Sequence, residues 1–201
     1  MKATLPSLAG YLDALPDGID SHPDARAKAT LYRSVIDSDT IAAADILPGP
    51  LQRLVETPPP VTAWIPEVHS HAMIKVVRDL RFDSDEDFIR FTYERQRTLF
   101  DGRLYRIMLA LASPSMLLRT AALRWRTFHR GSTFTVEEAS GTETRVRVDY
   151  AAGLWDRLLA DALAAGLQAA LDLSGALDAT LHISDLEPTM LRIHGTWRTP
   201  R

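Results

Sequence analysis

The chain has 201 residues, of which 46% are hydrophobic and 24% charged, and its formal net charge is −3. This length and balance predict one globular domain over residues 1–201, with a helical part over 1–130 and a hairpin–helix–hairpin part over 131–201. The absence of cysteine excludes disulfides, iron–sulfur clusters and thiol nucleophiles.

The first elements are separated by proline and glycine. Residues 18–38 are predicted to form a loop and then a helix, because Ser21 and Asp24 have the spacing of a capping box. A short helix is expected over 51–56. The three prolines at 58–60 must be extended, because proline disfavours the helix at its own position and at the residue before it.

Two helices are predicted next, over residues 66–80 and 85–100. Each carries apolar residues three or four positions apart, which is typical of a helix with one buried face. The buried faces are predicted to consist of Val68, Ala72, Met73, Val76 and Leu80 in the first helix, and of Phe88, Phe91, Arg95 and Leu99 in the second.

A short apolar helix over 104–111 precedes a longer one that starts at Pro114. Ser113 is the expected amino-terminal cap of the longer helix, and Gly131 is expected to end it. Its inward face should carry Leu117, Ala121, Trp125 and Phe128.

After Gly131 the pattern changes to the alternation of a strand. Phe134 and Val136, then Val146 and Val148, predict a β-hairpin that turns near Gly141. A long helix follows over 153–173 and a second hairpin over 180–184 and 190–197, which turns around Pro188. The element order indicates an α+β fold.

Charge is distributed unevenly along the chain. Residues 90–130 carry 9 basic and 2 acidic side chains, whereas the segments on either side are acidic. This basic segment could bind an anion or nucleic acid, or it could dock onto the acidic parts of its own fold. We favour docking within the fold, since interspersed charge is the usual solvated surface.

Two pairs of histidines suggest metal sites. His69 and His71 lie about 200° apart around a helix, so they cannot easily share one ion. In the last hairpin, a turn centred on Pro188 places His182 opposite His194 on the outward face. These two imidazoles could bind a metal or respond to pH, and the alternative is an ordinary pair of exposed histidines.

Arg126, His129 and Arg130 form the clearest candidate anion site, because guanidinium and imidazole groups bind phosphate or carboxylate. Tyr105 could assist such a site. The alternative is that these side chains stabilise the carboxyl end of the helix. The sequence contains no nucleophile elbow, dinucleotide fingerprint, phosphate loop or zinc-protease signature, so no catalytic residue is predicted.

Four segments resemble an uncharacterised paralogous family of about 200-residue proteins expanded in myxobacteria. They are SHPDARAK at 21–28, WIPEVH within 58–72, GRLYR at 102–106 and FHRG at 128–131. The resemblance covers nearly the whole chain. It implies a single domain and assigns no chemistry.

The element order is also similar to regulatory domains related to haem nitric-oxide sensors and to vesicle-tethering subunits. This similarity implies a pocket that binds a ligand or a surface that forms a dimer. The tyrosine, serine and arginine signature of the haem sensors is absent from this sequence, which argues against haem; the cofactor is left unknown.

The leading functional hypothesis is a non-enzymatic regulatory or interaction module whose partner is a protein or a small ligand. The alternative is an enzyme that acts on an anionic small molecule. Nucleic-acid binding is disfavoured by the pI near 6.1. No apolar run reaches the ~20 residues that span a bilayer, and no signal peptide is recognised, so we expect a cytoplasmic protein.

Overall fold

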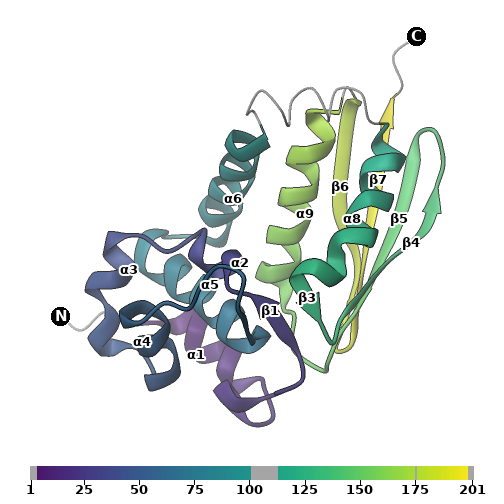
Figure 1. Ribbon diagram of the computed structural model, residues 1–201. Helices are drawn as coiled ribbons and strands as arrows, with labels where there is room; N and C mark the ends of the chain where they lie inside the picture. Colours follow the sequence, from purple (N-terminus) through teal and green to yellow (C-terminus); the bar gives the residue numbers. More distant parts are fainter. Residues whose placement is uncertain (1–3, 101–112, 175, 199–201) are drawn as a thin grey trace. The chain divides into compact units, whose positions relative to one another are not determined.

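The computed structural model describes residues 4–100, 113–174 and 176–198 (Figure 1). Helices and antiparallel sheets make up the fold, which confirms the α+β prediction. The chain divides into two compact units. The first comprises residues up to 85 with 127–132 and 151–154, and the second comprises 86–126, 133–150 and the residues from 155 onward.

Helices dominate the first unit, and the longest of them, α5, lies at its core. Val68, Ala72, Met73 and Val76 of α5 have no solvent exposure, as their spacing predicts. The prolines at 58–60 have no helical or strand structure. The helices are α1 (Pro6–Asp13), α2 (Thr30–Arg33), α3 (Ser38–Ala42), α4 (Gly49–Glu56) and α5 (Glu67–Arg81), with short 3₁₀ turns η1 (Gly18–Asp20) and η2 (Ala44–Ile46).

A small antiparallel sheet completes the first unit. It corrects the capping-box start of the helix predicted within 18–38, where a helix, α2, forms only over Thr30–Arg33. Its strands are β1 (Arg26–Lys28), β2 (Trp64–Pro66) and β3 (His129–Arg130), in the order β2-β1-β3. Ser21 does not cap a following helix, because its hydroxyl accepts the N–H of Asp17 at 2.9 Å. Pairing with β2 and β3 satisfies the backbone of β1, so tertiary pairing overrides the capping-box pattern.

Gly131 ends β3 in a backbone conformation that suits only glycine. Its φ is +84°, and a Cβ at this position would lie 3.0 Å from the Cα of Ala25. The sequence predicts Gly131 as the end of the preceding helix, α8 (Pro114–Phe128). The structure inserts the two residues of β3 between them.

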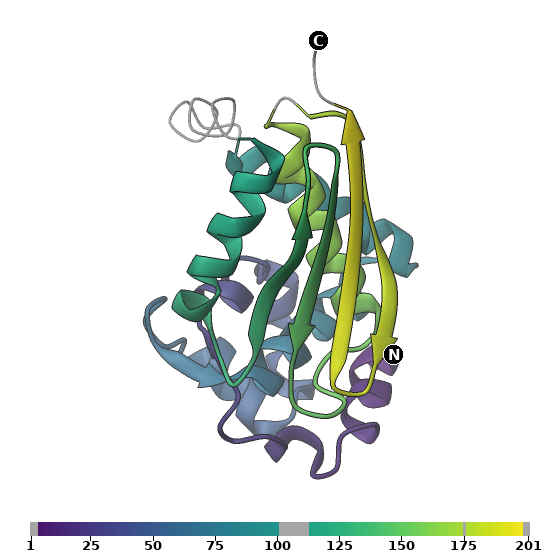
Figure 2. The same ribbon diagram turned by 90° about the vertical axis from the view of Figure 1, so that its right-hand side faces the viewer.

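The second unit is built on a four-stranded antiparallel sheet, seen face-on in Figure 2. Both predicted hairpins are present, and β4 and β6 form the edges because the order is β4-β5-β7-β6. Val146, Val148, Leu191 and Ile193 are fully buried, as the alternation predicts. The strands are β4 (Thr133–Ala139), β5 (Glu143–Asp149), β6 (Leu177–Glu187) and β7 (Met190–Arg198).

Helix α9 (Arg157–Asp172) packs against this sheet. It begins four residues later than the sequence predicts, because Gly153 has φ +74° and Asp156 is the cap, accepting the N–H of Leu159 at 3.1 Å. Helix α6 (Asp85–Phe100) has the predicted bounds, and the hydroxyl of Tyr93 donates to Asp172 at 2.6 Å.

Helix α8 begins as predicted, since the Ser113 hydroxyl accepts the N–H of Met116 at 3.2 Å. Trp125 is buried as predicted. Leu118 is buried in place of the predicted Leu117, and Phe128 is 37% exposed, contrary to prediction. Leu99 of α6 is also exposed, contrary to prediction. The predicted helix over 104–111 lies outside the described residues. No helix of the described chain is long and apolar enough to cross a membrane.

Candidate functional site

A cavity of about 640 Å³ lies between α8 and the edge strand β4 of the second unit, and it is partly open to solvent. Cavities of about 300–1,000 Å³ are typical of small-molecule sites. We call it the α8–β4 cavity. Its lining residues are Arg119, Ala122, Leu123, Trp125, Arg126, Thr133, Phe134, Thr135 and Val136.

Aromatic rings make the apolar wall of the α8–β4 cavity rigid. The ring centroids of Trp125 and Phe134 are 5.2 Å apart, and both side chains are mostly buried. Trp125 also lies 6.2 Å from Trp155, which in turn lies 6.2 Å from Tyr150. Offset and tilted aromatic pairs at these distances contribute about 0.5–1.5 kcal/mol each beyond their burial.

Two arginines give the same cavity a positive side. Arg119 and Arg126 are seven residues apart on α8, which is about two helical turns, so they lie on one face of the helix. Both are exposed. This combination suits a ligand with an apolar body and an anionic head, because the guanidinium fork binds carboxylate or phosphate.

The structure gives the predicted anion-site residues different partners. Arg126 lines the α8–β4 cavity. His129 is 8% exposed in the first unit, where its Nδ1–H donates to Oε1 of Glu67 at 2.7 Å. The Arg130 guanidinium lies 4.0 Å from the ring centroid of Trp64. Tyr105 lies outside the described residues, so its predicted role stays a prediction.

The most polar part of the first unit's interior is a set of residues that sequence reasoning missed. Glu67, His71, Lys75 and Asp79 recur every four positions along α5, and we call them the α5 stripe. The first three residues are at most 4% exposed, and the Asp79 side chain is fully buried. Four ionisable residues at helical spacing were a usable signal, because i, i+4 residues share one face.

Glu67 and His71, the first two residues of the α5 stripe, bind other segments of the first unit. Glu67 binds His129 of β3, and His71 donates from Nδ1 to the Leu154 carbonyl at 3.0 Å. The Tyr11 hydroxyl donates to the same carbonyl at 3.0 Å. Oε2 of Glu67 is buried without a hydrogen-bond partner, which is costly for a carboxylate unless a nearby cation compensates. Nε2 of His71 lies 3.7 Å from Oε1 of Glu67.

His69 does not belong to the α5 stripe. Burial lowers the pKa of its imidazole below the usual value of 6.5, and hydrogen bonding to the Ile19 backbone opposes this shift only in part. His71, two residues on, faces Glu67 and Leu154. The two imidazoles therefore have separate environments, as the helix geometry predicts.

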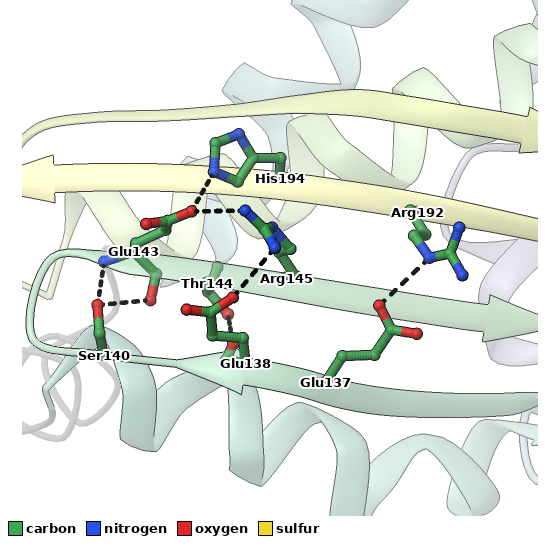
Figure 3. A network of polar contacts seen from close by, with 8 residues as sticks. All are labelled: Glu137, Glu138, Ser140, Glu143, Thr144, Arg145, Arg192 and His194. Atoms are coloured by element: carbon green, nitrogen blue, oxygen red, sulfur yellow. Dashed lines mark hydrogen bonds and ion pairs between the residues drawn. The ribbon is translucent and has the colours of Figure 1, made fainter.

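The histidines of the last hairpin face each other in the predicted register. His182 pairs with His194, and Thr180 pairs with Thr196. The imidazole centroids are 5.2 Å apart. Figure 3 shows that His194 also lies beside Glu143 of the neighbouring strand, with Nε2 at 2.9 Å from Oε1. Metal binding by this pair stays a prediction.

Comparison with solved structures relates the chain to H-NOX proteins. The crystal structure of the Fe(II) unliganded H-NOX protein from K. algicida has a TM-score of 0.57 at 10% identity, covering 86% of this chain and 97% of that chain. An alanine-to-glycine mutant from K. algicida gives a TM-score of 0.59 at 10% identity, covering 85% and 96%. This similarity shows a shared fold, as the element order of the haem nitric-oxide sensors predicts.

Sequence comparison adds no family. No protein-family model and no curated protein matches the chain. The resemblance to a myxobacterial family and the similarity to vesicle-tethering subunits therefore stay predictions.

The residues around the α8–β4 cavity do not fit an iron centre or haem. Iron in such centres is bound by histidine, cysteine, methionine, tyrosine or carboxylate. None of the described lining residues carries one of these groups. Across the described parts of the chain, no three or more His, Asp or Glu side chains are arranged to hold a metal ion.

Proposed function

We propose that the protein is a non-enzymatic regulatory module that binds a small amphipathic anion in the α8–β4 cavity. The observation that carries this proposal is the placement of Arg119 and Arg126 beside an aromatic wall formed by Trp125 and Phe134. The arginines would hold a carboxylate or phosphate head, and the apolar body of the ligand would pack on the rings. Burial of that body contributes about 25 cal/mol per Å².

The lining favours binding over catalysis. Its charged side chains are two arginines, and none of its described members is a histidine or carboxylate that could act as a general base. The alternative prediction, an enzyme acting on an anionic small molecule, relies on His129. Because His129 is buried against Glu67, we keep the binding module as the leading proposal.

A regulatory output is supported by the course of α8. Five residues of this helix between positions 119 and 126 line the cavity, and the chain continues directly from α8 into His129, which binds Glu67. A ligand that moves α8 would change the geometry of the hydrogen bond between His129 and Glu67. A ligand can shift an equilibrium between two conformations only by binding one of them more tightly. We expect the two conformations to differ at the contact between His129 and Glu67.

The first experiment compares decanoate with decanol, which has the same chain length and no charge. Tryptophan fluorescence reports binding, because Trp125 lies in the cavity wall. We expect decanoate to bind at least about tenfold more tightly, which corresponds to about 1.4 kcal/mol from the charged head. Arg119→Gln and Arg126→Gln should each reduce this preference. Arg124→Gln, on the same helix but outside the lining, is the matched control.

Equal binding of the acid and the alcohol would contradict the proposal, as would an undiminished preference in both lining variants. The regulatory part has its own readout. Decanoate should shift the imidazole NMR resonances of His129 in the wild type, and the shift should be lost in Arg126→Gln. A ligand that binds without moving these resonances would leave a binding module with no output through α8.

Three further predictions from the sequence, on partners, location and domain number, remain part of the proposal. We propose a protein partner or a homodimer, a cytoplasmic location and one domain over residues 1–201. Light scattering with and without decanoate tests the dimer. A single unfolding transition seen by both tryptophan fluorescence and far-UV circular dichroism tests the single domain.

A further inference from the structure

The outward face of the second unit's sheet brings together groups that the α8–β4 cavity does not use. His182 and His194 face each other across β6 and β7, and Arg145 of β5 is the cross-strand neighbour of His194. Glu143 lies two residues before Arg145 on β5 (Figure 3). These side chains are fixed by strand pairing, so their spacing does not depend on a flexible loop.

The separation of the two imidazoles matches the requirement of one tetrahedral ion. Zn²⁺ holds imidazole nitrogens at about 2.0–2.1 Å, so two rings on the same ion have centroids about 5 Å apart. The observed centroid separation is 5.2 Å, with the rings 85° apart in orientation. The two imidazoles therefore already have the spacing that one shared ion requires.

Glu143 prepares His194 for this role. Its carboxylate can only accept, so Nε2 of His194 carries the proton of the 2.9 Å hydrogen bond. The Nδ1 atom then presents its lone pair. Metal-binding histidines generally have this arrangement, in which a carboxylate fixes the tautomer and orientation of the ring.

The local charge also suits a cation. Arg145 lies between two carboxylates, at 3.3 Å from both Glu138 and Glu143. Two carboxylates and one guanidinium leave one excess negative charge beside His194. Arg192, two residues before His194 on β7, is likewise paired, with Glu137 at 3.3 Å. A divalent ion therefore does not meet an uncompensated positive charge.

We propose that His182 and His194 are the protein ligands of a Zn²⁺ site on this face, with Glu143 as the positioning residue of His194 and water completing the coordination. Because only two side chains bind the ion, the site is consistent with the absence of any three-residue cluster in the described chain. The proposal is independent of the α8–β4 cavity and of the function proposed for it.

The test is calorimetric titration of Zn²⁺ into the full chain, prepared without a histidine tag. We expect one ion per chain. His182→Ala and His194→Ala should each weaken binding at least about tenfold, and Glu143→Gln should weaken it about tenfold through the orientation of His194. Thr180→Ala, in the next row of the same face, is the matched control and should bind as the wild type does. Circular dichroism verifies that each variant is folded.

Two results would overturn the site. One is a wild type that takes up no Zn²⁺ at millimolar concentration, and the other is a folded His182→Ala/His194→Ala double variant that binds as tightly as the wild type. Unchanged affinity in Glu143→Gln would overturn the positioning role. A cobalt-substituted sample adds a spectroscopic readout, since the visible absorption of Co²⁺ reports its coordination and should disappear in the double variant.

Discussion

Asp79 accepts the backbone N–H of Leu8 at 3.0 Å, although 71 positions separate the two residues in the chain. The same carboxylate accepts the N–H of Ser7 at 3.2 Å. Helix α1 has no side-chain cap of its own, so a residue of α5 supplies the acceptor that its amino terminus requires.

We expect Asp79→Ala to destabilise the protein by about 1–2 kcal/mol, the usual cost of losing a helix cap. Urea unfolding measures the loss. Asp85→Ala is the control, because Asp85 also pairs with Arg78 but is 61% exposed, and exposed pairs contribute little. Similar losses in both variants would show that Asp79 acts only as a partner of Arg78.

The buried hydrogen bond from Nδ1 of His129 to Oε1 of Glu67 should couple these two residues strongly. Removing one partner leaves the other polar group buried without it, which costs about 1–3 kcal/mol, and more for a charged group. Glu67→Gln and His129→Gln should therefore each be destabilising, and the double variant should lose much less than the sum of the two. A double-mutant cycle by urea unfolding measures this coupling, and additive losses would contradict it.

His69 should make stability fall at acid pH. Its pKa is lowered in the folded state from 6.5, so the unfolded chain binds the proton more readily. The free energy of unfolding should therefore decrease as pH falls below about 6.5 and continue to fall until the folded pKa is passed. His69→Gln should have a shallower slope in this window and run parallel to the wild type between pH 7.5 and 8.5. Identical slopes below pH 6.5 would refute the assignment.

Tyr150 should ionise later than an ordinary tyrosine. Burial, aided by the charge of Glu187, raises its pKa to about 12 from the ordinary 10, and its hydroxyl donates to the Glu187 carbonyl at 2.8 Å. Absorbance at 295 nm should show a late step that is missing in Tyr150→Phe. Because the folded pKa is raised, this residue's contribution to stability should be lost as pH rises above 10. A wild type without the late step would contradict the prediction.

Gly131→Ala should be destabilising by about 1–3 kcal/mol, since the new residue would hold φ +84° and its Cβ would meet the Ala25 backbone at 3.0 Å. Thermal unfolding measures the effect. Gly141→Ala is the control, because a Cβ there has nothing within 4 Å. Equal melting temperatures for the two variants would mean that the backbone at Gly131 can relax.

The elements that follow a clear period could be predicted from sequence, whereas those that depend on distant partners could not. The α5 core and both hairpins follow directly from apolar spacing, and Pro188 gave the register of His182 with His194. Strand β1 could not be predicted, because three residues become a strand only when β2 and β3 lie beside them.

The candidate sites also combine residues that could be predicted from sequence with contacts that could not. Arg126 could be proposed from its residue type and position. The cavity that it lines could not, because the opposite wall belongs to Phe134 of another element. The α5 stripe was missed because ionisable residues on a helix are normally taken for its solvated side. Their burial depends on Tyr11, His129 and Leu154, which reach α5 from distant parts of the chain.

The first unit is not a continuous stretch of chain, since residues 127–132 and 151–154 return to it after the chain has entered the second unit. A fragment ending near residue 85 would therefore lack both the imidazole that pairs with Glu67 and the carbonyl that binds His71. Neither unit can be transferred intact to another protein by one recombination event. The two must be inherited together, and a protease cut in any one crossing segment should leave both halves noncovalently associated.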